Sequence, residues 1–235
     1  MRMYVAVIGL LALGALFACL GAWQLARADV SRATLAAFEA GAAEPVRAAL
    51  PRSLDEERRF ERVQVRGEYE LEPQFLLDNM LHDGVAGYHV LSALRVHGLR
   101  ERVLVNRGWV PVGADRRVLP EVAVSPGERT VVGRLERLPR PGIRLGEDSA
   151  SGAPEPLLVL QYPTAQTLAA RLGEPVLDYQ LLLDAAAPDG YVREWRAPVL
   201  PPERHLGYAV QWWALGVGAV AAGLVLGLRT LRRTP

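Results

Sequence analysis

The chain has 235 residues and one cysteine, Cys19, which excludes an internal disulfide and any metal or redox site built from a pair of cysteines. Its formal net charge is +1 at pH 7, but all 26 acidic and 22 of the 27 basic residues lie between Asp29 and Arg204, which gives that stretch a net charge of −4. A mildly acidic domain is a poor candidate for binding nucleic acid.

Two stretches without charge predict two membrane helices. Tyr4–Ala26 and Leu206–Leu228 have 23 residues each, and a helix of that length spans roughly 34 Å. The hydrocarbon core of a bilayer is about 30 Å thick, so each stretch is long enough to cross it. Arg2 precedes the first stretch, and three arginines follow the second. The positive-inside rule then predicts that both termini are cytoplasmic and that the segment between the helices lies on the outer side.

The segment between the helices, residues 28–200, predicts a domain of mainly β structure. It begins with a helix over Asp29–Leu50 that continues or bends from the first membrane helix and is broken by Pro45 and Pro51. From Phe60 onward, apolar and polar residues alternate, and Gly, Pro and Asp-Gly turns separate the short runs. The predicted strands are Val63–Glu68, Gln74–Asp78, Tyr88–Val96, Arg102–Val110, Arg129–Leu138, Leu157–Gln161 and Val176–Leu183.

One helix is predicted within this domain, over Thr164–Leu172; Pro163-Thr164 starts it and Gly173 ends it. Arg140–Pro156 is a loop by composition. The fold class is therefore a two-helix transmembrane hairpin carrying an outer-face α+β domain, mainly an antiparallel β-sheet or small barrel with one or two helices. The membrane helices are placed at residues 4–26 and 206–228.

Three clusters of polar and aromatic residues are candidates for function. The first is Gly21–Arg27 ("GAWQLAR"), at the outer end of the first membrane helix. Trp23 and Arg27 are typical of an interface belt, with the indole at headgroup depth and the guanidinium in water. Gln24 is harder to explain, because an amide at that depth needs a partner. An interface anchor and part of a binding site both remain open for this cluster.

The second cluster is Asn106–Pro111 ("NRGWVP"), at the end of a predicted strand. In the structural interpretation this cluster is a turn, because Asn and Gly tolerate positive φ, and Trp109 packs in the core. The spacing alone favours this interpretation. In the functional interpretation, Arg107 pairs with a carboxylate such as Asp78 or with the acid group of a ligand.

The third cluster is Glu203–Gly216 ("ERHLGYAVQWWALG"), which opens the second membrane helix. At 100° per residue, His205, Tyr208 and Trp212 share one face, above a groove of alanines and glycines. That groove admits either the first helix or a planar ligand. His205 is an interface anchor or a metal ligand through a neutral imidazole, and Gln211, on another face, has no assigned role.

Taken together, the three clusters resemble the Surfeit locus protein 1 family. "GAWQLAR" matches the family's G-x-W-Q-x-x-R, "LLDNMLHDGVAGYHVLSALRV" and "VLVNRGWVPVGADR" resemble its central block, and "HLGYAVQWWALG" resembles the signature that opens its second helix. The family commonly has Asn-Arg after Leu-Asp, whereas here Asp78 is followed by Asn79 and Met80. A role for an arginine at that place is therefore not carried over.

The resemblance implies a non-enzymatic assembly factor for haem-copper cytochrome c oxidase that assists delivery or insertion of haem a into subunit I. It implies a bacterial-type member in the cell inner membrane, with a periplasmic central domain. The implied partners are subunit I and haem a synthase, together with membrane lipid. The sequence leaves open whether a second copy of the chain also binds, through the glycine faces of the helices.

The resemblance also implies a site for haem a, held transiently, with His205 as the iron ligand. Imidazole suits haem iron, Arg204 and Arg27 suit the propionates, and Tyr208 and Trp212 form an aromatic wall. The remaining residues of the implied cofactor site are Trp23, Gln24, Arg107 and Trp109.

Two alternatives stay open. One is a scaffold that stabilises an oxidase assembly intermediate without binding haem. The other is an enzyme of the outer face, for which the sequence offers His82, Asp83, His89, Ser92 and His97. His82 and Asp83 precede Gly84, however, and predict a turn. The enzyme is disfavoured because the chain has neither a nucleophile elbow nor an HExxH motif, and because His89 and Ser92 should face opposite sides of their strand.

Overall fold

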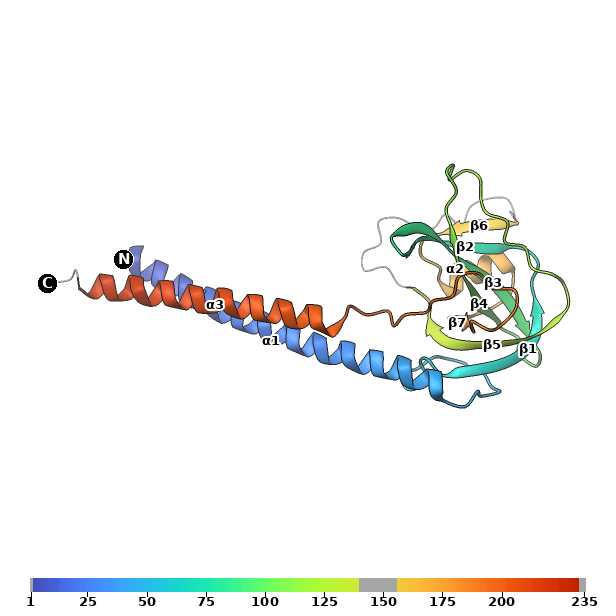
Figure 1. The fold of residues 1–235 in the computed structure, drawn as a ribbon, viewed down its shortest axis with the longest axis horizontal. Coiled ribbons are helices and arrows are strands. Elements are labelled where there is room, and N and C mark those ends of the chain that lie inside the picture. Colours follow the sequence, from blue (N-terminus) through green and yellow to red (C-terminus); the bar gives the residue numbers. More distant parts are fainter. Residues whose placement is uncertain (1, 140–155, 233–235) are drawn as a thin grey trace. The chain divides into compact units, whose positions relative to one another are not determined.

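A computed structural model describes residues 2–139 and 156–232 of the chain (Figure 1). The chain divides into two compact units. One combines the two ends of the chain, up to Ala37 and from Ala197, and the other runs from Phe38 to Arg196. The predicted loop Arg140–Pro156 lies, apart from its last residue, outside the described residues.

Two long helices form the first unit, as predicted, although the last residues of α1, from Phe38, belong to the second unit. Helix α1 spans Arg2–Ala43 and helix α3 spans Pro202–Leu231. Both are long and apolar enough to cross a membrane, and large apolar side chains such as Ile8, Leu16 and Leu224 are exposed along them. Outward-facing apolar side chains are what lipid tails accept. Which residues of each helix lie in the bilayer stays a prediction.

The end of α1 differs from the expected one. The helix was expected to reach Leu50, but it ends at Ala43, two residues before Pro45. Proline disfavours helical backbone in the residue before it, so a helix normally ends there. The chain then turns to pair with the β domain, where Arg47 forms a bridge with Val63.

A seven-residue repeat joins α1 and α3 into an antiparallel pair. Small residues are buried at one position of the repeat: Gly14, Gly21 and Ala28 on α1, and Pro202, Ala209, Gly216, Gly223 and Thr230 on α3. Three residues further along each helix lies a second layer: Leu10, Phe17, Gln24 and Ser31 on α1, and His205, Trp212, Ala219 and Leu226 on α3. We call these two layers the helix seam. A seven-residue repeat keeps one stripe of each helix facing its partner, as in a left-handed coiled coil.

The glycines of the seam let the two backbones approach. A Cβ atom on Gly14 would lie 2.6 Å from Val220 Cγ2 and 3.3 Å from the carbonyl oxygen of Gly216. On Gly21 it would lie 2.2 Å from the indole nitrogen of Trp213. The groove of small residues on α3 is therefore filled by α1, and the alternative of a planar ligand inside that groove was wrong.

The second unit contains a five-stranded barrel, in agreement with the predicted fold class. Its strands follow the closed order β1-β5-β7-β4-β3-β1, and β2 and β6 extend the sheet beyond β3 (Figure 1). Pairing is antiparallel except for β4 with β7 and β2 with β6. The strands are β1 Arg62–Tyr69, β2 Gln74–His82, β3 Val85–Val96, β4 Arg102–Pro111, β5 Glu128–Arg137, β6 Leu157–Leu160 and β7 Val176–Leu183.

Alternating apolar residues of these strands fill the barrel interior, with Tyr179 and Leu181 fully buried in it. Helix α2, Ala165–Leu172, inserts Leu168 into a second apolar cluster beside β2, β3 and β4. The predicted caps of this helix are confirmed: the Thr164 side chain accepts a hydrogen bond from the Thr167 amide, and Gly173 ends the helix at φ 69°.

Candidate functional site

The candidate site of the helical unit is a pair of polar residues in the helix seam, Gln24 and His205. His205 Nδ1 lies 2.8 Å from Gln24 Oε1. An amide oxygen only accepts, so Nδ1 carries the proton and donates it. In neutral imidazole the lone pair is then on Nε2, which has no hydrogen-bond partner among the described residues. The sequence singled out both residues, and the structure brings them together. Gln24 holds the imidazole ring at Nδ1, and the lone pair on Nε2 is left for coordination.

The first turn of α3 is fixed close to this pair. Pro202 and Ala28 are buried in the helix seam, and the Ser31 hydroxyl donates a hydrogen bond to the carbonyl oxygen of Leu200, just before α3 begins. A proline at the first helical position is pre-organised for helix and needs no amide partner. His205 therefore sits on a helix end whose position against α1 is determined by several contacts.

Of the aromatic residues predicted for the haem site on the two helices, one is packed in the helix seam and two are exposed. Trp212, expected as a wall of the haem site, stacks on Phe17 with ring centroids 5.5 Å apart. Tyr208 and Trp23 are about half exposed, at 51% and 55%. Trp212 is thus engaged in the helix seam, whereas Tyr208 and Trp23 keep accessible aromatic faces.

Sequence reasoning missed two residues that hold this pair of helices together. Trp213 covers Gly21 and donates through Nε1 to the carbonyl oxygen of Ala18, at 3.3 Å, and Phe17 stacks on Trp212. The seven-residue spacing from Gly14 to Gly21 and from Gly216 to Gly223 was the available signal. Arg27 and Arg204, the predicted propionate ligands, are both exposed.

Arg107 of the predicted set belongs to the β domain and is committed to it. It is 3% exposed and donates to the carbonyl oxygens of Asp189 and Val122, at 2.7 and 2.8 Å, and to the Ser92 hydroxyl. The ion pair with Asp78 proposed from the sequence is not formed, because Asp78 pairs with Arg116 at 3.3 Å. These bonds give Arg107 a structural role, the interpretation that spacing alone favoured.

Trp109 is likewise in the core of the β domain. It is 8% exposed, and its indole nitrogen donates to the carbonyl oxygen of Met80 at 3.1 Å. Its backbone forms a bridge with Val192. Trp109 therefore ties the end of β2 and the segment after β7 to β4.

A second histidine, His89, lies in a buried polar network of the same domain. Asn106 Nδ2 is 3.2 Å from His89 Nδ1 and 3.1 Å from Gln180 Oε1, while Asn106 Oδ1 accepts from the Gly108 amide. Because the amide nitrogen donates, His89 Nδ1 is the acceptor and Nε2 carries the proton. Burial, with a smaller effect from nearby His82, lowers the His89 pKa to about 4, so this imidazole is neutral at pH 7.

The sequence profile of the SURF1 family matches residues 11–217 of the chain. The chain belongs to the SURF1 family. No curated protein matches it. The matched region contains all three clusters, including Gln24 and His205, so the resemblance drawn from them is confirmed. The SURF1 family is associated with assembly of cytochrome c oxidase and is a family of assembly factors rather than of catalysts.

Proposed function

We propose that this SURF1 family member holds haem a during oxidase assembly, with His205 Nε2 as the iron ligand, and hands it to subunit I. The observation that carries the proposal is the hydrogen bond between His205 Nδ1 and Gln24 Oε1. Metal-bound histidines generally donate their other ring N–H to a fixed acceptor, which sets the tautomer and the ring orientation. Gln24 supplies that acceptor.

The residues around His205 suit haem as a cargo. Haem iron takes imidazole as an axial ligand, and we propose that the macrocycle contacts the half-exposed rings of Tyr208 and Trp23. Arg27 and Arg204 offer guanidinium groups for propionates. A half-buried histidine at a helix end, rather than an enclosed cavity, suits a carrier that must release what it holds.

The membrane setting is part of the proposal. Two apolar helices fit a membrane protein, and the arginines at the chain ends favour cytoplasmic termini. The β domain is then periplasmic in the inner membrane of a bacterium. We propose oxidase subunit I and haem a synthase as the partners that receive and supply the haem.

A scaffold that binds no haem is the second candidate, and one observation favours it. Gln24 and His205 occupy the same layer of the helix seam as Phe17 and Trp212. A polar pair within a coiled-coil seam is able to fix the register of two helices and needs no further role. In that case His205 is a packing residue, and haem delivery does not depend on it.

Complementation separates the two candidates. In a host lacking its own family member, the wild-type chain should restore the haem a content per subunit I, and His205→Ala should leave it at the level of the uncomplemented host. His97→Ala is the matched control, because His97 is an exposed histidine of the β domain. Full haem a content with His205→Ala, together with co-purification of subunit I, would establish the scaffold instead.

A further inference from the structure

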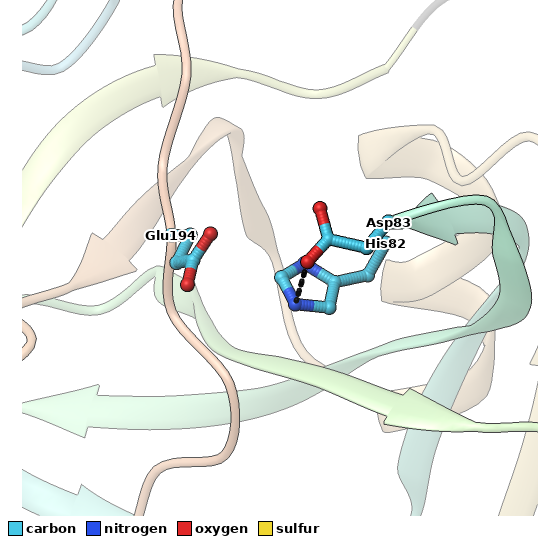
Figure 2. A group of neighbouring side chains, drawn as sticks. All are labelled: His82, Asp83 and Glu194. Carbon is cyan, nitrogen blue, oxygen red and sulfur yellow. Dashed lines mark ion pairs between the residues drawn. The ribbon is translucent and has the colours of Figure 1, made fainter.

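Three metal-ligating side chains converge at one edge of the β domain. His82, Asp83 and Glu194 each offer a ligand atom, and these atoms all lie within 4.8 Å of one another. Figure 2 shows them facing the same space from two segments, the β2–β3 turn and the chain after β7. We propose that they bind a divalent transition-metal ion of the zinc class. This inference is independent of haem binding by His205.

The β2–β3 turn holds His82 and Asp83 in place. Asp83 and Gly84 both have positive φ, 47° and 80°, which reverses the chain tightly after β2. Trp109 donates to the Met80 carbonyl, and its ring lies 5.1 Å from the His82 ring. The imidazole is thus supported on a buried tryptophan, with Nε2 3.6 Å from Asp83 Oδ2.

Glu194 lies between two anchored neighbours. Arg193 donates to the carbonyl oxygens of Asp184 and Ala187, and the Trp195 indole donates to the carbonyl oxygen of Leu183 at 2.8 Å. These contacts fix the backbone on both sides of Glu194, so its carboxylate is presented to His82 and Asp83 from a defined position. A pre-formed site loses less conformational entropy when it binds an ion.

The donor set suits zinc. One imidazole nitrogen and two carboxylate oxygens are ligand types that Zn²⁺ accepts, and the two negative charges match a dication. Three protein ligands leave one coordination position open, which at zinc sites takes water or another ligand.

A cavity of about 210 Å³ adjoins the three ligands. His89, Trp109 and Trp195 contribute to its lining. Because His89 Nδ1 accepts from Asn106, its Nε2–H is a donor and not a ligand. The cavity therefore offers a hydrogen-bond donor and aromatic surface to a small molecule or side chain that completes the coordination of the ion.

The Arg196 guanidinium contacts both carboxylates of the proposed site, so a metal ion would compete with it for them. Its Nη2 lies 3.6 Å from Asp83 Oδ1 and 3.4 Å from Glu194 Oε2. The Arg196 side chain is 75% exposed, and ion pairs exposed to this extent stabilise a fold only weakly. A dication can therefore displace the guanidinium, and removing Arg196 should favour the metal.

The test is Zn²⁺ affinity of the full-length chain in detergent, measured by competition with a chromophoric chelator. All variants carry His205→Ala, so that His205 cannot contribute. We expect one Zn²⁺ per chain. His82→Ala should weaken binding by about 10–100-fold or more, since even an outer-shell partner of a metal is worth that much.

Matched variants sharpen the result. His97→Ala removes a histidine that also lies beside a carboxylate, Glu128 at 3.8 Å, and should change nothing. Glu194→Gln keeps the shape of an exposed side chain and should weaken binding, which covers the case that His82→Ala fails to fold. Arg196→Gln should tighten it. Equal affinities of His82→Ala, Glu194→Gln and His97→Ala, or no Zn²⁺ bound by the parent, would overturn the proposal.

Discussion

The two units of the chain each hold one histidine against one side-chain amide, and they do so in opposite ways. In the helix seam, His205 Nδ1 meets the amide oxygen of Gln24. In the β domain, His89 Nδ1 meets the amide nitrogen of Asn106. The first contact makes Nδ1 a donor and leaves the Nε2 lone pair for a metal, whereas the second uses the Nδ1 lone pair and leaves Nε2 protonated.

The hydrogen-bond partner of each imidazole ring therefore decides whether the ring has a lone pair free to bind a metal. Asn106 has a fixed orientation, because its oxygen accepts from Gly108 and its nitrogen also donates to Gln180. His89 is one part of a polar network in which Asn106 holds Nδ1, so the neutral ring keeps no free lone pair for a metal. His205 has one hydrogen bond from Nδ1 and an Nε2 without a partner in the described chain.

The largest effect is expected from removing the amide in the β domain. Asn106→Leu leaves the Gly108 amide and the Gln180 oxygen without partners in a buried site, at about 1–3 kcal/mol each. We expect the domain to lose about 2–6 kcal/mol of unfolding free energy, the sum for the two groups. The matched change Gln24→Leu should cost the hairpin about 1 kcal/mol, the usual value of a hydrogen bond between membrane helices. Hydrogen exchange reports both units within the full chain, and equal losses would contradict the comparison.

Acid should also weaken the β domain through His89. The folded pKa is about 4 and the unfolded value about 6.5. Between these values the unfolded chain binds more protons, so the unfolding free energy falls as pH decreases from about 6.5 to 4. At about 1.4 kcal/mol per unit, the loss is about 3 kcal/mol. Urea unfolding at several pH values measures it, and His89→Gln should flatten this part of the profile. An unchanged profile in that variant would show that His89 is not the group responsible.

The smallest effect tests the helix seam that positions Gln24. In Gly21→Ala the new Cβ meets the Trp213 ring, whereas at Gly9 it meets nothing within 4 Å. Both changes raise helix propensity alike, so their difference isolates helix packing. We expect Gly21→Ala to be less stable than Gly9→Ala by about 1 kcal/mol in thermal unfolding in detergent. Equal thermal stability of the two variants would mean that packing at Gly21 does not stabilise the helix pair.

The sequence predicted what local chemistry determines. Strand β7 was placed at Val176–Leu183, as found, and α2 was predicted with both its caps, since alternation and capping are local signals. The closure of the barrel by β1 on β3 was not predicted, because pairing between distant strands leaves no trace in period or turn chemistry.

The candidate sites were predicted as residues but not as contacts. Gln24 and His205 were both singled out, yet their pairing over 181 positions follows from the register of the helix seam, which small residues establish only in three dimensions. A turn was expected at His82 and Asp83; the turn begins at Asp83, whereas His82 is the last residue of β2. Glu194 was missed as their neighbour, because the segment after β7 has no periodicity and is held by side-chain bonds to distant backbone.

The most direct test of the central claim is the optical spectrum of the purified chain after co-expression with haem a synthesis. The claim predicts a histidine-ligated haem a spectrum in the wild-type protein, its loss in His205→Ala, and its partial return when free imidazole is added to that variant. His89→Gln should keep the spectrum, because His89 Nε2 is protonated. An unaltered haem spectrum in His205→Ala would contradict the assignment of His205 as the ligand.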